Sequence, residues 1–212
     1  KDLKKIQFSK YPSIDKFYDT LSKWLKIKKD NIYVTEGLDG AIRTGFFCFT
    51  DKKSEIIFLN PTFAMYEVYS KMFNIKYHNI NYTKDYKIDF EKIYSKINKN
   101  TALIFLPLPN NPISGFFSKP KLIALLKFCK KNKIILFIDE VYYPFNKSLF
   151  YKHIDQYDNL IIARSFSKAF GLASIRLGYM IASSKLIKYV KNSRSGYETN
   201  ELSVSVASTL IN

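Results

Sequence analysis

Short apolar runs alternate with helical patterns along nearly the whole of this 212-residue chain. The candidate strands are residues 31–35, 55–59, 75–80, 102–106, 134–139, 160–163 and 177–182, and the helical patterns cover residues 40–49, 64–73, 90–97, 119–131 and 185–192. Continuous apolar strands bury both of their faces, and the amphipathic helices between them supply the cover. The pattern therefore predicts an α/β fold, in which a mostly parallel seven-stranded sheet is covered by helices on both faces.

Length and composition agree with one globular domain, or with one domain and part of another, because 47% of the residues are hydrophobic. The longest apolar runs, residues 103–108 and 134–138, are too short to cross a bilayer, so we expect a cytoplasmic protein without membrane association. Cys48 and Cys129 stand apart in apolar surroundings, which predicts reduced, buried thiols. The two histidines are also isolated, so we expect no metal site.

A formal net charge of +16 raises the question of nucleic-acid binding, since clustered lysines displace the counterions of a phosphate backbone. The 34 basic residues, however, are spread along the whole chain. Short lysine clusters at residues 26–29 and 130–133 fall at expected helix ends, where cations complement the helix dipole. We therefore expect small-molecule partners and no nucleic acid.

Polar residues follow the expected strands at the carboxyl edge, where parallel sheets bind their ligands. Asp139 ends one apolar run, and Asn110 and Asn111 lie just past another. The segment 35–42 leads from a strand through a glycine turn into a helix, whose first N–H groups form a site for an anion such as phosphate. The alternative for this segment is an ordinary strand, turn and helix with Asp39 as the N-cap.

Lys168 differs from most lysines of the chain because small, apolar and hydroxyl-bearing residues surround it. An amine that is partly withdrawn from water and close to another cation becomes a better nucleophile for a carbonyl. Ser165, Ser167 and Arg176 offer the hydroxyl donors and the planar guanidinium that a phosphate monoester needs. A phosphorylated aldehyde fits this set, and pyridoxal 5'-phosphate is such a molecule. The alternative is two strands joined by a loop with a surface lysine.

Arginine is scarce in this chain. Of the 34 basic residues, Arg43, Arg164, Arg176 and Arg194 alone are arginine. A chain so rich in lysine is expected to keep arginine where lysine cannot serve, as at a bidentate contact with an oxyanion. The scarcity favours the ligand interpretation of the Lys168 segment over the surface loop.

Six sequence blocks, taken together and in order, carry the strongest signal. They are Tyr11-Pro12, Val34-Thr35-Glu36-Gly37-Leu38-Asp39-Gly40-Ala41, Pro61-Thr62-Phe63-Ala64-Met65-Tyr66, Pro109-Asn110-Asn111-Pro112-Ile113-Ser114-Gly115, Ile138-Asp139-Glu140-Val141-Tyr142 and the segment from Ser165 to Tyr179. This set resembles the class I and II aminotransferases, pyridoxal-phosphate enzymes of fold type I, and most closely their histidinol-phosphate aminotransferase branch. Small departures at Ile113-Ser114-Gly115, Val141 and Ser174-Ile175 remove no cofactor contact but leave the branch, and so the substrate, open.

The resemblance implies a role for each block. Lys168 holds the cofactor covalently through its aldehyde and then moves the proton between the substrate Cα and the cofactor C4′. Asp139 pairs with the pyridinium nitrogen, and Phe63 stacks on the ring. The resemblance also implies that Asn111 and Tyr142 contact the phenolic oxygen O3′. The phosphate is implied to contact the following groups: Ser165, Ser167, Arg176, the backbone N–H groups of Leu38 and Asp39, and Tyr11 of the partner subunit.

The implied activity is transfer of an amino group between an amino acid or amino alcohol phosphate, similar to histidinol phosphate, and 2-oxoglutarate, in a homodimer. Residues 1–212 correspond to an incomplete large domain, in which residues 1–30 contribute to the dimer interface. The C-terminal small domain of the family, with its arginine for the substrate carboxylate, is absent from these 212 residues. Two alternatives are a threonine-phosphate decarboxylase-like enzyme with the same cofactor site and a catalytically silent basic binding module.

Overall fold

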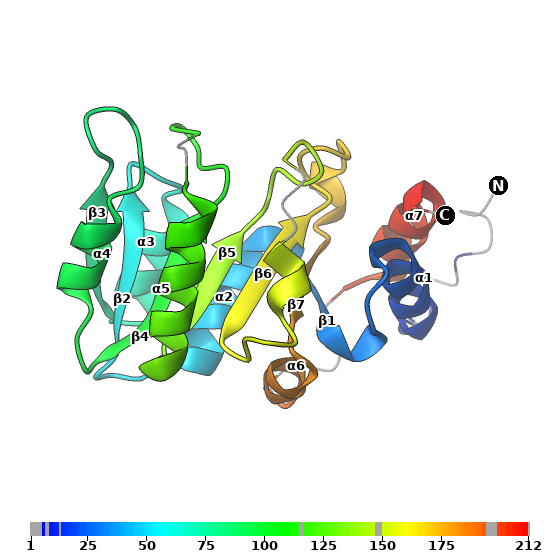
Figure 1. Cartoon of the computed structure of the whole chain (residues 1–212). Coiled ribbons are helices and arrows are strands. Elements are labelled where there is room, and N and C mark those ends of the chain that lie inside the picture. Colours follow the sequence, from blue (N-terminus) through cyan, green and yellow to red (C-terminus); the bar gives the residue numbers. More distant parts are fainter. Residues whose placement is uncertain are drawn as a thin grey trace.

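A computed structural model describes residues 6, 9–12, 14–114, 117–146, 150–193 and 199–211. Its centre is one sheet, made of β1 (Ile32–Thr35), β2 (Glu55–Asn60), β3 (Lys76–Asn81), β4 (Thr101–Pro107), β5 (Ile135–Asp139), β6 (Leu160–Ser165) and β7 (Gly178–Ala182). The strand order is β1-β7-β6-β5-β4-β2-β3 (Figure 1). Strand β7 runs antiparallel to both of its neighbours, and the pairs from β6 to β3 are parallel. The predicted mostly parallel, seven-stranded sheet is confirmed.

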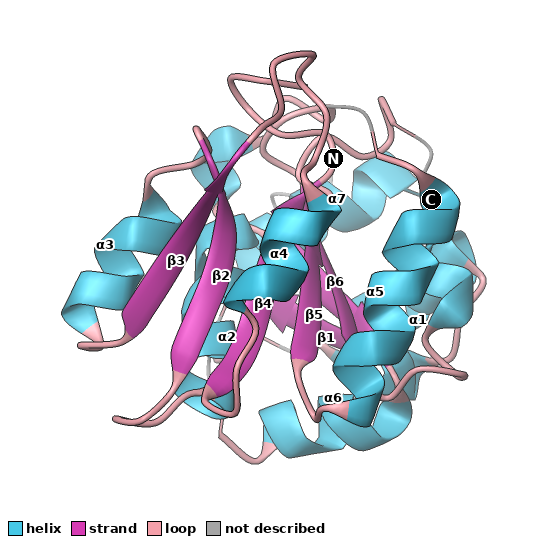
Figure 2. Ribbon diagram, turned by 60° about the vertical axis from the view of Figure 1, so that its left-hand side comes forward, coloured by secondary structure: helices cyan, strands magenta, loops and turns pink. Residues whose placement is uncertain are grey.

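Helices cover both faces of the sheet. One face carries α2 (Gly37–Phe49), α3 (Met65–Met72) and α6 (Ser184–Lys191), and the other carries α1 (Asp15–Leu25), α4 (Phe90–Lys96), α5 (Lys119–Lys131) and α7 (Glu201–Ile211). In Figures 1 and 2, α4 and α5 lie in front of the strands and α2 lies behind them. Each layer of helices forms its own hydrophobic cluster with one face of the sheet, as the continuous apolar strands predict.

The five predicted helices are all present, but the start of α2 differs from the prediction. This helix begins at Gly37, three residues before the expected position, and Glu36 lies at its N-cap. The reason is the φ of +70° at Gly37, a left-handed conformation that makes the sharp turn out of β1. The sequence patterns missed two further helices, α1 and α7, which pack against each other beyond strand β1 (Figure 1).

Short 3-10 turns complete the described elements: η2 (Lys29–Asn31), η3 (Phe150–His153) and η4 (Ala173–Ile175). None of the helices in the described part of the chain combines the length and apolar character needed to span a membrane. Cys48 and Cys129 are buried and no disulfide joins them, as predicted. Burial raises the pKa of the Cys129 thiol to about 12, so this thiol stays protonated.

Candidate functional site

A cavity of about 290 Å³ opens where strands β4, β5 and β6 end and helix α2 begins. Its lining residues are Leu38, Asp39, Phe63, Pro107, Pro109, Asn110, Asn111, Asp139, Val141, Tyr142, Ser165, Ser167, Lys168, Ala173 and Arg176. Ten of the eleven residues proposed from the sequence as cofactor contacts are among them. The eleventh, Tyr11, is expected to contact the cofactor of the partner subunit; it is 72% exposed and does not line the cavity of its own chain.

The carboxylate of Asp139 lies at the buried base of the cavity, with 1% of the residue exposed. Its Oδ1 accepts a hydrogen bond from the backbone N–H of Val141 at 2.9 Å, and its Oδ2 accepts one from the hydroxyl of Tyr66 at 2.5 Å. Burial raises the pKa of this carboxyl to about 6, although both hydrogen bonds act in the opposite direction. Asp139 is therefore mostly ionised at neutral pH, and a cation bound beside it would stabilise the buried carboxylate.

The N-terminus of α2 and the guanidinium of Arg176 form one corner of the cavity. The first N–H groups of α2 have no acceptor within the helix, so they can bind an anion. A methyl group built on Gly37 would lie 3.0 Å from Nη2 of Arg176, which shows how closely the guanidinium approaches this turn. A methyl group on Gly178 would lie 2.6 Å from the carbonyl carbon of Gly37. Glycine at both positions thus lets β7, the turn and Arg176 come together.

Lys168 stands on a loop that is closed at its base. The N–H of Leu172 donates to the carbonyl of Phe166 at 3.0 Å, and the N–H of Gly171 donates to the carbonyl of Lys168 itself, also at 3.0 Å. The buried ring of Phe166 packs against Phe170, with 5.1 Å between the ring centroids. These contacts fix the backbone of the loop, while the exposed Lys168 reaches the cavity.

Two serine hydroxyls lie between this loop and β6. The hydroxyls of Ser165 and Ser167 are 2.9 Å apart, and the hydroxyl of Ser165 also accepts the backbone N–H of Ser167 at 3.0 Å. Both residues line the cavity together with Arg176. The hydroxyl donors and the guanidinium expected for a phosphate are therefore on the same wall.

Asn110 and Asn111 have different surroundings, although they are neighbours in sequence. Asn110 is buried and joins three segments, because its amide donates to the carbonyl of Pro61 at 2.7 Å and to the Tyr82 hydroxyl at 2.8 Å, and its Oδ1 accepts from Thr62 at 2.7 Å. Asn111 is exposed and lines the cavity. The first asparagine holds the loops, and the second is available to a ligand.

A buried ion pair ties the ends of β5 and β6 together directly behind the cavity. Nε of Arg164 lies 2.8 Å from Oε2 of Glu140, and both side chains are 1% exposed. The guanidinium carbon also lies 3.5 Å from the centre of the Tyr143 ring. Glu140 follows Asp139 and Arg164 precedes Ser165, so this pair fixes the spacing between two segments of the cavity wall.

Sequence reasoning missed two tyrosines of α3 that bind carboxylates of the cavity. Tyr66 bonds Asp139, and the hydroxyl of Tyr69 donates to Oδ2 of Asp39 at 2.8 Å. The other oxygen of Asp39 is buried and has no partner within the described residues. A spacing of three residues places both tyrosines on one helix face. That spacing was visible in the sequence, but their distant partners were not.

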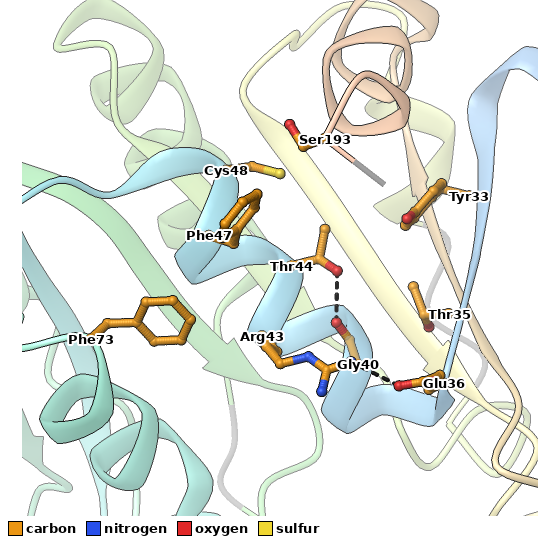
Figure 3. Close-up of a pocket in the computed structure, with 10 residues that line it drawn as sticks. All are labelled: Tyr33, Thr35, Glu36, Gly40, Arg43, Thr44, Phe47, Cys48, Phe73 and Ser193. Atoms are coloured by element: carbon orange, nitrogen blue, oxygen red, sulfur yellow. Dashed lines mark hydrogen bonds and ion pairs between the residues drawn. The ribbon is translucent and has the colours of Figure 1, made fainter. Parts of the chain in front are cut away.

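A second hollow, of about 280 Å³, lies along another stripe of α2 (Figure 3). Its lining residues are Tyr33, Thr35, Glu36, Gly40, Arg43, Thr44, Phe47, Cys48, Phe73 and Ser193. Arg43 forms an ion pair with Glu36 at 2.7 Å, with more than half of each side chain exposed. None of the residues proposed from the sequence as site residues lines this hollow.

The chain is similar to known proteins in both sequence and structure. A family model described as aminotransferase class I and II matches residues 3–212. A histidinol-phosphate aminotransferase of Pyrococcus furiosus is 37% identical over 208 residues, which are 97% of this chain and 60% of that protein. The structure of the histidinol-phosphate aminotransferase from Clostridium acetobutylicum matches with a TM-score of 0.86 at 26% identity, covering 96% of this chain and 61% of that chain.

A third match shows likeness in fold. The histidinol-phosphate aminotransferase from Sinorhizobium meliloti, solved in complex with pyridoxal-5'-phosphate, has a TM-score of 0.86 at 20% identity. The aligned region covers 96% of this chain and 56% of that chain. The chain described here likewise spans 55% and 60% of the length of two curated relatives that it matches.

Proposed function

The chain belongs to the class I and II aminotransferase family, and from this premise we propose that it forms the cofactor-binding part of a pyridoxal-phosphate-dependent aminotransferase. The reaction moves an amino group between an amino acid or amino alcohol phosphate, of the histidinol-phosphate kind, and 2-oxoglutarate. The curated relatives support the donor class. In this proposal residues 1–212 are an incomplete large domain, and residues 1–30 contribute to a dimer interface.

One observation carries the proposal. Ten residues proposed from the sequence line a single cavity, although they come from five separate segments and lie as far apart in sequence as Leu38 and Arg176. The cavity offers a lysine, a buried carboxylate and an anion-binding corner, and pyridoxal phosphate has an aldehyde, a basic ring nitrogen and a phosphate. Each group of the cofactor therefore has a chemically matching partner among the residues present.

The phosphate belongs in the corner formed by α2 and Arg176. Hydroxyl groups of Ser165 and Ser167 and the first N–H groups of α2 supply donors, and the guanidinium supplies charge and two parallel hydrogen bonds. The carboxylate of Asp39 does not need to face the phosphate, because one of its oxygens is bound by Tyr69. Repulsion between the two anions is reduced in this way.

Asp139 holds the proton of the ring nitrogen. Its carboxylate is the buried anion of the cavity, and a cation beside it offsets the cost of burial. When bound, the cofactor supplies an electron sink that stabilises the carbanion at the substrate Cα, and this sink is strongest with a protonated ring. Lys168 is the base that removes the Cα proton, and Phe63 covers the ring. Asn111 and Tyr142 donate to the phenolic oxygen.

A homodimer is the proposed assembly, with Tyr11 reaching the phosphate in the cavity of the partner subunit. Large apolar side chains are exposed on the face of α2, α3 and α6: Phe47 is 63% exposed, Met72 69% and Tyr189 53%. The hollow in Figure 3 lies on this face and begins at the N-terminus of α2. A second copy of the chain bound in this hollow would lie next to the corner, formed by α2 and Arg176, that is proposed to bind the phosphate. Exposed apolar surface of this kind commonly marks an interface.

Sodium borohydride treatment of the chain with pyridoxal phosphate tests the site, because reduction fixes the cofactor on the lysine that holds it. We expect a pyridoxyl group on the peptide that contains Lys168.

The activity is tested on the whole protein with labelled glutamate, which a transaminase converts into labelled 2-oxoglutarate. Release of carbon dioxide from O-phosphothreonine would instead identify the decarboxylase-like alternative. Failure to bind the cofactor, together with binding of nucleic acid, would favour the silent basic module. The cytoplasmic location stays a prediction.

A further inference from the structure

Tyr66 is among the largest fully buried side chains of the described chain, and its ring is held on several sides. The centroid of the Tyr66 ring lies 4.9 Å from that of Phe105 and 5.9 Å from that of Phe58. The ring of Phe63, a wall of the cavity, stands at 90° to it with 6.2 Å between centroids. Packing on these sides leaves the hydroxyl of Tyr66 one fixed direction.

That direction ends at the carboxylate of Asp139. Tyr66 donates to one carboxylate oxygen at 2.5 Å, and the N–H of Val141 donates to the other at 2.9 Å. A carboxylate has about four acceptor positions, so two remain for other donors. Because Asp139 also lines the cavity, these positions are available to a ligand.

The electrostatic surroundings keep Tyr66 a donor. Burial raises the pKa of its hydroxyl well above the ordinary value, and the nearby Asp139 and Tyr82 act in the same direction. Glu140, beside Asp139, is bonded to Arg164. The other titratable groups that face the cavity are Asp39, Tyr142, Lys168 and Arg176. Among the groups around Asp139, the Tyr66 hydroxyl is the strongest influence that favours its carboxylate form, against burial, which disfavours it.

We propose that Tyr66 is a positioning residue of the active site: its hydroxyl aims the Asp139 carboxylate into the cavity and keeps it in the anionic form that holds the proton on the ring nitrogen of the cofactor. The proposal rests on the proposed function. It differs from a purely structural role, in which Tyr66 fills the core and Asp139 merely satisfies its hydroxyl. The difference is measurable, because a structural role leaves the protonation of Asp139 and of the ring nitrogen unchanged.

The test replaces Tyr66→Phe, which keeps the ring and removes the hydroxyl. The matched control is Tyr77→Phe, since Tyr77 also donates to a carboxylate, that of Glu67 at 3.0 Å, and stacks on the same Phe58 ring at 5.2 Å. In the cofactor-free chain with carbon-13-labelled aspartate, NMR follows the titration of Asp139, and Asp139→Asn assigns its signal. We expect Tyr66→Phe to move this titration upward by roughly one pH unit or more, and Tyr77→Phe to leave it in place.

The second measurement uses pyridoxal phosphate labelled with nitrogen-15 in the ring. In the wild-type chain at neutral pH we expect the signal of a protonated ring nitrogen. In Tyr66→Phe the carboxylate is more basic, so the signal moves toward that of an unprotonated pyridine. Circular dichroism verifies that both variants are folded.

The outcomes separate this proposal from the proposed function. If the wild-type chain binds no cofactor, the proposed function fails, whereas Tyr66 is still judged by the titration of Asp139. If the cofactor binds and Tyr66→Phe matches the wild type in both measurements, the role of Tyr66 is wrong and the proposed function stands. Should Tyr66→Phe not fold, incorporation of 3-fluorotyrosine keeps the ring and strengthens the donor. It must then lower the pH at which Asp139 titrates, and an unchanged or higher value overturns the proposal.

Discussion

Replacing Asp139→Asn is expected to make the cofactor-free chain more stable while it removes the pairing group for the ring nitrogen. The asparagine has nearly the same shape as the aspartate: its carbonyl oxygen can accept the N–H of Val141, and its amide can donate to the oxygen of Tyr66, whose hydroxyl proton then turns away from residue 139. What the substitution removes is a buried negative charge. Residues kept for function often lower the stability of the fold, so replacing such a residue by a neutral one is expected to raise the free energy of unfolding.

The size of this gain follows from the pKa of Asp139, which burial raises from the ordinary 3.8 to about 6. A raised carboxyl pKa means that the folded chain holds the proton more tightly than the unfolded chain, so stability falls as the pH rises from about 4 to about 6 and then stays level. Two pKa units at 1.36 kcal/mol each correspond to about 3 kcal/mol near pH 7.5. Near pH 4.5, where this cost is only partly developed, the same relation leaves about 1 kcal/mol.

Urea unfolding of the cofactor-free wild-type and Asp139→Asn chains at pH 4.5 and 7.5 measures both values. The variant should be the more stable chain, with a larger advantage at pH 7.5 by about 2 kcal/mol. Asp155→Asn is the control, because Asp155 is exposed and does not line the cavity. An advantage of equal size at the two pH values, or a less stable variant, would refute the reasoning that buried charge is the cost.

Three further predictions address the cofactor contacts. Lys168→Ala should fold but give no pyridoxyl peptide after borohydride treatment, and mass spectrometry that still finds label on this peptide would show the assignment to be wrong. Arg176→Lys should weaken pyridoxal phosphate binding by about 1.5–3 kcal/mol, tenfold or more, since lysine lacks the two parallel hydrogen bonds, while Arg43→Lys on α2 should bind as the wild type. If both variants lose the same affinity for pyridoxal phosphate, Arg176 does not bind the phosphate, and the turn at the start of α2 would be its only site. Gly178→Ala should lower both thermal stability and cofactor affinity, because its methyl group would lie 2.6 Å from the backbone of Gly37; a variant as stable as the wild type would count against that contact.

The sheet was predictable because each strand carries its own signal. An apolar run such as residues 134–139 has to be buried on both faces wherever it lies, so the sequence alone identifies it as a central strand. Helices α1 and α7 gave a weaker signal. The two helices lie near opposite ends of the chain, outside the alternation of strands and helices, and each packs against the other. Their pairing joins residues near opposite ends of the chain, which no local pattern records.

Residues at strand ends were predictable for a similar reason. Asp139 and Ser165 each end a strand of the sheet, and parallel topology brings such ends to one edge without further information. Tyr66 could not be found in this way, since it lies in a helix and its partner is 73 residues away. Its place in the site depends on how α3 crosses the sheet, and that is set by the aromatic packing around Phe105.

Burial of charge behind the cavity explains why the site needs so many supporting contacts. Asp139 is unfavourable when buried alone, and the adjacent Glu140 adds a second negative charge that also acts to raise its pKa. Arg164 compensates Glu140, while Tyr66 and Val141 bind the carboxylate of Asp139. None of these contacts fully offsets the burial of Asp139, because its pKa remains raised. A cation at the open side of this carboxylate would complete the compensation. Binding of the protonated ring nitrogen is therefore favoured by the charge of Asp139 that the folded chain leaves only partly compensated.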